Sequence, residues 1–138
     1  MHGLTDGKPV VFDTNFVITL LHNRQKGMTD TFDADFAEKD CFASEITEIE
    51  LLSFPGITEE EEAEIGRFFR DVTIIPLNRE VKQKTIAFRR ATNRKLPDSI
   101  IAATALLLDA DVVSDDGKLL NATYPSLRVI PIQSSFSC

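Results

Sequence analysis

The stretch PVVFDTNFVITLL, residues 9–21, decides how this chain folds. A short apolar run that is rich in β-branched residues leads through Asp13 into a segment whose apolar residues recur at helical spacing. A strand that passes directly into a helix is the basic unit of parallel α/β folds. A carboxylate between two buried segments costs folding free energy unless something pairs with it. Asp13 is therefore the first candidate functional residue.

The same alternation continues along the chain. Short apolar runs occur at PVVF, CFAS, VTIIP, DVVS and LRVIPI, and segments of helical periodicity lie between them: NFVITLLHN, EITEIELLSF, EEEEAEIGRFFRD, REVKQKTIAFRRATNRK and PDSIIAATALLLDA. Strands that alternate with helices predict an α/β fold, with a mainly parallel sheet covered on both faces. Residues 24–40 fit neither pattern, and we expect either a loop or a short helix around residues 32–39.

Composition indicates an ordinary globular protein. The chain has 138 residues, of which 43% are apolar and 27% charged, and we expect a single domain over residues 1–138. We expect a cytoplasmic location without membrane association, because no apolar run is long enough to span a bilayer and the first residues lack the apolar core of a signal peptide. The two cysteines do not make a disulfide framework.

The net charge of −7 argues against nucleic-acid binding through a general positive field, although a local basic face remains compatible with it. Much of the acidity lies in TEEEEAEIGRFF, residues 58–69. Thr58 and Glu61 match a capping box, and glutamates in a first helical turn suit the helix dipole. This run predicts a solvated helix start rather than a metal site.

Other acidic residues stand where ligands bind in open α/β sheets, beyond the carboxyl ends of the strands. Asp13 follows PVVF, and both Asp115 and Asp116 follow DVVS. Asp98 opens an alanine-rich helix that is apolar on nearly every side. Each of these residues, taken alone, also suits a turn, an N-cap or a helix dipole.

The helix after CFAS adds a glutamate to this group. Glu50 lies along an apolar row of this helix, with Ile46 four residues before it and Phe54 four residues after, whereas Glu48 projects to the polar side and Glu45 stands at the helix start. Carboxylates gathered at one sheet edge cannot all stay ionised without compensation. An all-oxygen site favours Mg²⁺ or Mn²⁺, and zinc is disfavoured because the two histidines stand outside the pattern.

Four segments resemble the motifs of the PIN domain family, in the right order and spacing: VVFDTNFVITLL, SEITEIELL, LPDSIIAATAL and VVSDDGKL. The chain is most similar to the small bacterial and archaeal members that include the VapC-type toxins. The resemblance implies a three-layer α/β/α sandwich with a five-stranded, mainly parallel sheet. It also implies a metal-dependent ribonuclease that uses Mg²⁺ or Mn²⁺ and leaves a 5′-phosphate and a 3′-hydroxyl.

The resemblance also implies which residues form the site. Asp13, Glu50 and Asp98 match three acidic residues of the family that serve in catalysis and metal binding. Asp116 matches the fourth, in SDD where the family has T-x-D; Ser114 replaces the threonine, and Asp115 remains a competitor for the role of ligand. Asn15 matches a small polar residue of the first motif, which is expected to orient Asp13 or to bind phosphate.

RNA requires a basic surface, and residues 79–95 hold seven of the 15 basic residues. The end of this segment precedes Asp98, so we expect phosphate contacts from Arg89, Arg90, Arg94 and Lys95; a solvated helix face is the simpler alternative. An antitoxin protein and a homodimer are the expected protein partners. Two other functions stay open: a Mg²⁺-dependent phosphoacceptor domain, although position 15 is not the aspartate of a D-x-D pair, and a PIN-fold protein that acts mainly by binding a partner.

Overall fold

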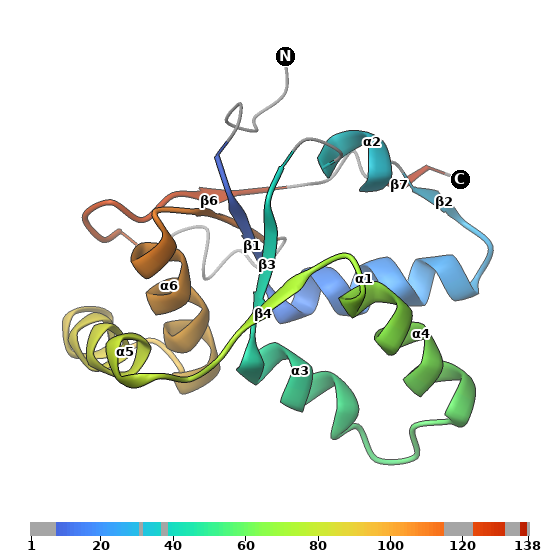
Figure 1. The fold of residues 1–138 in the computed structure, drawn as a ribbon, viewed down its shortest axis with the longest axis horizontal. Coiled ribbons are helices and arrows are strands. Elements are labelled where there is room, and N and C mark those ends of the chain that lie inside the picture. The colour runs from blue at the N-terminus through green and yellow to red at the C-terminus, as the bar shows by residue number, and fades with distance from the viewer. Residues whose placement is uncertain (1–7, 31, 37–38, 115–122, 132–135, 138) are drawn as a thin grey trace.

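The computed structural model describes residues 8–30, 32–36, 39–114, 123–131 and 136–137 (Figure 1). The strands are β1 (Val10–Phe12), β2 (Thr29–Asp30), β3 (Cys41–Ser44), β4 (Thr73–Ile75), β5 (Asp111–Val113), β6 (Val129–Ile130) and β7 (Phe136–Ser137). The helices are α1 (Thr14–Gln25), α2 (Phe32–Phe36), α3 (Glu45–Leu52), α4 (Glu59–Phe69), α5 (Arg79–Thr92) and α6 (Leu96–Leu108). Each of the five apolar runs forms a strand and each of the five periodic segments forms a helix, as predicted.

The main sheet has five strands in the order β4-β3-β1-β5-β6, and every neighbouring pair is parallel. The central strand β1 pairs with β3 in the register Phe12–Ala43 and with β5 in the register Phe12–Val113. All five strands therefore deliver their carboxyl ends to one edge. The predicted five-stranded parallel sheet is confirmed.

The ambiguous segment, residues 24–40, contains a short helix, which is one of its two expected structures. Helix α1 continues to Gln25, and α2 then covers Phe32–Phe36. Strand β2 lies between them and pairs antiparallel with β7 near the end of the chain. This second sheet was not predicted, because two-residue strands leave no periodic pattern.

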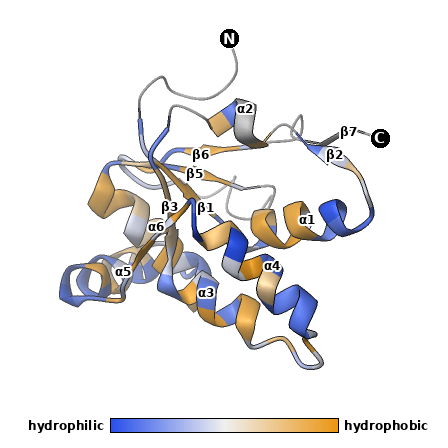
Figure 2. Ribbon diagram, turned by 45° about the vertical axis from the view of Figure 1, so that its right-hand side comes forward, coloured by the Kyte–Doolittle hydropathy of each residue, from blue (hydrophilic) through white to orange (hydrophobic). Residues whose placement is uncertain are grey.

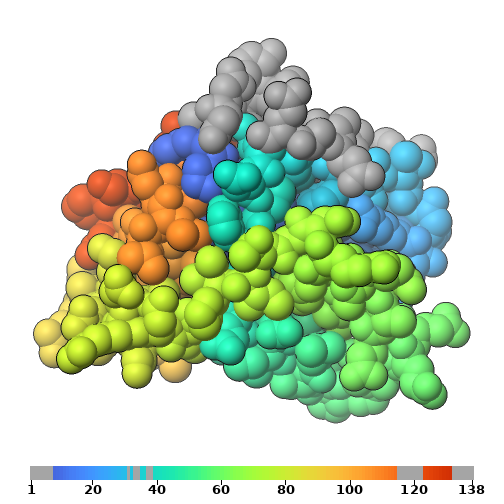
Figure 3. Space-filling view, in the orientation of Figure 1, coloured from blue at the N-terminus to red at the C-terminus, as the bar shows by residue number. Residues whose placement is uncertain are grey.

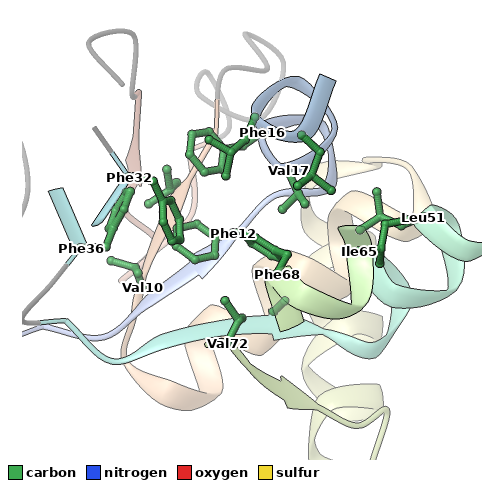
Figure 4. Close-up of a cluster of buried hydrophobic side chains, with 14 of the residues drawn as sticks. Val10, Phe12, Phe16, Val17, Phe32, Phe36, Leu51, Ile65, Phe68 and Val72 are labelled. Carbon is green, nitrogen blue, oxygen red and sulfur yellow. The ribbon is translucent and has the colours of Figure 1, made fainter. Parts of the chain in front are cut away.

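Helices cover both faces of the main sheet (Figures 1 and 2). On one face, α1, α2 and α4 bury an aromatic cluster around Phe12, whose ring centroid lies 5.1 Å from that of Phe36 and 5.4 Å from that of Phe16 (Figure 4). On the other face, α6 packs Ile101 and other small or aliphatic residues against the strands, and α5 packs against α6. The three-layer α/β/α arrangement is confirmed.

Capping interactions define the helix ends as the sequence predicts. Thr58 and Glu61 form the reciprocal hydrogen bonds of a capping box at the start of α4. The glutamates of this run therefore lie in a first helical turn and satisfy the helix dipole. Helix α5 ends at Thr92, and the left-handed backbone of its C-cap Asn93 (φ 54°) turns the chain towards α6, which begins at Leu96.

An ion cluster lies at the amino ends of the central strands. Asp111 is fully buried at the start of β5, and neither of its carboxylate oxygens has a hydrogen-bond partner among the described residues. Lys8 Nζ and Arg128 Nε each lie 3.6 Å from Asp111 Oδ1. Since Lys8 precedes β1 and Arg128 precedes β6, this carboxylate connects three strands of the sheet at the edge opposite Asp13.

Cys41 is half-buried at the start of β3, and burial raises the pKa of its thiol to about 11. A thiol with so high a pKa is a poor nucleophile at neutral pH.

Within the described ranges, no helix is long and apolar enough to cross a membrane.

Candidate active site

Asp13 ends β1 and precedes the first residue of α1. Its backbone N–H donates to the Val113 carbonyl at 3.0 Å, and its carbonyl accepts from the Val17 N–H at 3.2 Å. The side chain is 1% exposed and makes no capping hydrogen bond to α1. Instead, Asp13 Oδ2 accepts a hydrogen bond from Ser114 Oγ at 2.7 Å. The sequence position of Asp13 also suited an N-cap, but its carboxylate does not cap α1.

Helix α3 places three glutamates in three different surroundings. Ser44 caps the helix by accepting from the Ile46 N–H at 3.1 Å. Glu45 Oε1 accepts the Leu77 N–H at 2.9 Å and so ties the start of α3 to the chain after β4. Glu50 is half-buried and lines a cleft that it shares with Asp13, whereas Glu48 does not line this cleft. Glu50 therefore lies at the cleft, and its role as a ligand stays a prediction.

Asp98 lies in the first turn of α6, directly after Pro97. Buried Ser99 fixes this turn by donating its hydroxyl to the Lys95 carbonyl at 2.8 Å. Asp98 lines the same cleft as Asp13 and Glu50. Helices α1, α3 and α6 therefore all supply residues to the wall of this cleft. The cleft has a volume of about 530 Å³ and is lined by Asp13, Thr14, Asn15, Ile18, Glu50, Ser53, Phe54, Pro55, Lys95, Pro97 and Asp98.

Comparison with known protein families identifies the family to which this arrangement belongs. The sequence profile of the PIN domain matches residues 10–123, which include β1 through β5 and all three cleft carboxylates. The chain belongs to the PIN domain family. The predicted resemblance is therefore confirmed. VapC-like PIN proteins are nucleases, so the chain has the fold of a family of nucleases.

Solved structures agree with the family assignment. A toxin–antitoxin complex from Klebsiella pneumoniae superposes with a TM-score of 0.68 at 26% identity, covering 86% of this chain and 94% of that one. VapBC-1 from nontypeable Haemophilus influenzae gives a TM-score of 0.73 at 20% identity, covering 88% and 96%. DNA-bound VapBC from Salmonella typhimurium gives 0.72 at 19% identity, covering 90% and 98%. None of the curated protein sequences matches the chain.

The donors in the cleft of this PIN domain suit a hard cation. They are carboxylate oxygens from three separate elements, and no histidine or cysteine of the described residues lines the cleft. Such oxygens are the preferred ligands of Mg²⁺ and Mn²⁺. In the described part of the chain, no three acidic, histidine or cysteine residues stand close enough together to form a metal-binding group by themselves. Asp115 and Asp116, the two candidates for the fourth ligand, lie outside the described residues.

The basic residues near the cleft differ in their positions. Lys95 lines the cleft, and it makes no ion pair with any described residue. Arg89 Nε donates to the Arg94 carbonyl at 3.1 Å, which holds the connection between α5 and α6. Arg94 Nε is buried and has no hydrogen-bond partner in the described ranges, and Arg90 is exposed on α5. Of the four predicted RNA-contacting residues, only Lys95 lies in the cleft itself.

Sequence reasoning did not single out two hydroxyl residues next to the carboxylates. Thr14 lines the cleft, and its Oγ1 lies 2.8 Å from Thr47 Oγ1 in the protein interior. The signal was present in the motifs DTN and TEIE, where each threonine stands close to an acidic residue. Only the packing of α1 against α3 shows that the two hydroxyls meet.

Proposed function

We propose that this PIN domain is a metal-dependent endoribonuclease of the toxin type, which hydrolyses phosphodiester bonds of RNA in the cytoplasm. The observation that supports the proposal best is the convergence of Asp13, Glu50 and Asp98 on one cleft, at the carboxyl edge of a parallel sheet. Carboxylates that share a cleft repel one another unless a cation lies between them, and Asp13 carries the additional desolvation cost of its burial.

Asp13, Glu50 and Asp98, together with Asp116, would hold one or two Mg²⁺ or Mn²⁺ ions. A divalent ion bound there supplies an activated water near neutral pH and offsets charge on the phosphate and on the leaving oxygen. The chain itself supplies orientation. Ser114 holds Oδ2 of Asp13, and the backbone of Asp13 is fixed between β5 and α1. Lys95 lines the cleft and would attract a phosphate into surroundings that are otherwise acidic.

An RNA cleavage assay with and without EDTA tests the proposal, using wild type, Asp98→Ala, Glu50→Gln and Glu48→Gln. Glu48→Gln is a matched control, because it removes the same charge from the same helix outside the cleft. EDTA should abolish cleavage, and Asp98→Ala and Glu50→Gln should lose more than the roughly 10–100-fold that removal of an outer-shell metal partner costs. The proposal is refuted if EDTA has no effect or if Glu48→Gln and Glu50→Gln lose activity equally.

RNA binding by the end of α5 is the second part of the proposal. Arg94 directly precedes Lys95, which lines the cleft, so a phosphate held at Lys95 would lie close to a second cationic residue. Removing one interaction with a phosphate of single-stranded RNA should lower the slope of log K against log salt by about 0.7.

Charge reversal distinguishes specific contacts from a general field. Arg94→Glu and Arg90→Glu should weaken binding of a single-stranded RNA and reduce its salt dependence. Lys84→Glu is the matched control, because Lys84 lies on the same helix in a separate groove beside Leu106 and Tyr124. An equal effect from Lys84→Glu would mean that only net charge matters, and the assignment of Arg90 and Arg94 would fail.

An antitoxin is the proposed protein partner. A toxin–antitoxin complex is among the solved structures that this chain resembles. An apolar groove of about 330 Å³ between α1, α3 and α4 has Ile18, Leu21 and Ile65 among its walls, and it shares Ile18, Phe54 and Pro55 with the cleft. A partner segment in this groove would reach the cleft directly. Co-expression with a cognate antitoxin should suppress RNA cleavage, and Phe54→Arg, at an exposed residue of the groove, should restore it.

A homodimer is the remaining proposed assembly. Helix α3 lies at the surface between α4 and α5 (Figure 3), and it exposes Ile49 and Leu52, at 50% and 40% respectively. Exposed apolar residues on one helix, between an acidic and a basic neighbour, suit a self-complementary contact. Sedimentation analysis should give a dimer for the wild type and a monomer for Ile49→Asp. A monomeric wild type would refute this assembly.

The phosphoacceptor alternative has less support. Asp13 is almost completely buried, and one of its oxygens is engaged by Ser114, whereas a phosphoacceptor must present its carboxylate to a phosphate donor. Labelling of Asp13 by acetyl phosphate would favour this alternative over the nuclease.

A further inference from the structure

Two threonine hydroxyls meet in the interior beside the cleft. Thr14 Oγ1 and Thr47 Oγ1 lie 2.8 Å apart, and either atom can be the donor. Thr14 is 7% exposed and Thr47 is 0% exposed. The two residues are 33 positions apart in the chain, so this hydrogen bond joins α1 to α3 and not neighbouring turns of one helix.

Each threonine stands next to a cleft carboxylate. Thr14 follows Asp13 and opens α1, and Thr47 lies three residues before Glu50 on α3. Residues three apart on a helix occupy the same side, one turn from each other. The hydroxyl pair therefore connects the first turn of α1, which Asp13 precedes, to the turn of α3 that leads to Glu50.

Packing alone does not require a polar pair at this position. Valine has nearly the shape of threonine, and two apolar side chains would satisfy a buried contact between two helices without any hydrogen bond to complete. A hydrogen bond differs from an apolar contact because it holds two atoms at a defined distance and direction. The polar pair is thus suited to setting the separation of two helices.

We propose that Thr14 and Thr47 are positioning residues, which set the placement of Asp13 relative to Glu50 and thereby the affinity of the cleft for a divalent cation. The inference rests on the proposed metal-dependent function. Ser114, directly after β5, holds the Asp13 carboxylate by a hydrogen bond, and the threonine pair joins the two helices α1 and α3 beside Asp13 and Glu50. Outer-shell groups that hydrogen-bond a metal ligand typically alter affinity by about 10–100-fold, and we expect an effect at the lower end of this range from a pair that acts through the two helices.

Binding of Mn²⁺ alone, followed by electron paramagnetic resonance, tests the proposal without an activity assay. The variants are Thr47→Val, Thr14→Val, the double variant and Thr47→Ser, each checked for folding by urea unfolding in EDTA. Thr47→Val and Thr14→Val should each weaken Mn²⁺ binding by at least about tenfold. The double variant should be no weaker than the single ones, because both remove the same hydrogen bond, and Thr47→Ser should bind Mn²⁺ like the wild type.

The outcomes separate this inference from the proposed function. If wild type binds no Mn²⁺, or if Asp98→Ala leaves its binding unchanged, the metal site itself is wrong and the positioning role falls with it. If Asp98→Ala abolishes binding while folded Thr47→Val and Thr14→Val bind like the wild type, the metal site stands and the positioning role is refuted. Thr14→Val carries the test alone if Thr47→Val does not fold. Weak Mn²⁺ binding by Thr47→Ser, which keeps the hydroxyl, would refute the assignment of the effect to the hydrogen bond.

Discussion

Ser114→Ala removes the hydrogen bond that links the carboxyl end of β5 to the carboxylate of Asp13, and its cost can be worked from the structure. The Ser114 Oγ to Asp13 Oδ2 distance is 2.7 Å, and both residues are almost completely buried. Such a short distance is typical of a hydroxyl that donates to a carboxylate. Hydrogen bonds to charged groups contribute about 1.5–3 kcal/mol, so the free energy of unfolding should fall by about that amount.

Urea unfolding in EDTA measures this decrease directly. The variant should lower the midpoint with an unchanged m-value, since it alters one hydrogen bond and not the surface exposed on unfolding. Asp13→Asn completes a double-mutant cycle: against an amide, removal of the Ser114 hydroxyl should cost only about 0.5–1.5 kcal/mol, the value for a neutral hydrogen bond. Ser53→Ala, at an exposed serine beside the same cleft, is the control and should change stability by less than about 0.5 kcal/mol.

The reasoning fails if Ser114→Ala costs no more than Ser53→Ala. It also fails if the cost is the same with Asp13 and with its amide, because the charge of the carboxylate would then contribute nothing to the interaction. Either result would mean that Ser114 fills space at the end of β5 and does not hold the carboxylate.

Three further predictions concern stability. The hydrogen-bonded Arg24 guanidinium holds the pKa of Asp30 below its usual 3.8, so the ion pair stabilises the fold fully above about pH 4 and progressively less as the pH falls through the lowered pKa. Arg24→Gln should therefore flatten the dependence of unfolding free energy on pH in this acid range. An unchanged dependence would contradict this role of Arg24. Phe12→Ala should cost about 3–5 kcal/mol in urea unfolding, because its buried ring contacts four other rings, and a decrease below about 1 kcal/mol would mean that the cluster is loosely packed. Lys8→Met should lower the unfolding free energy more than Asp111→Asn does. Lys8→Met leaves the buried Asp111 carboxylate with one cation fewer, whereas Asp111→Asn leaves a lysine that water can solvate. The reverse order of the two losses would refute the role of the ion cluster.

The architecture of the main sheet could be predicted from the sequence because its signals are local. Apolar runs and helical periodicity are properties of neighbouring residues, and strands that alternate with helices admit few other arrangements. The same logic separated Glu50 from Glu48, since the two differ in the side of a short helix that they occupy. That difference needs only helical geometry and an apolar row, both of which can be read from one short segment.

Contacts between distant residues were beyond such reasoning. The Thr14–Thr47 pair, the Ser114 hydroxyl on Asp13 and the cations beside Asp111 depend on how whole elements pack, not on any pattern within one of them. A threonine in an amphipathic helix suits a surface position as well as a buried one. The short strands β2 and β7 were missed for the related reason that two residues carry no period.

The distance in sequence between the parts of the cleft has a consequence during protein synthesis. Asp13 and Ser114 are 101 residues apart, and β1 acquires its partner β5 only after most of the chain has been translated. Long-range parallel pairing is also slow to form. If the protein cuts RNA as proposed, the ribosome that produces it is a potential substrate at close range. The order of the elements would then delay assembly of the cleft until synthesis has passed Ser114, 101 residues after Asp13.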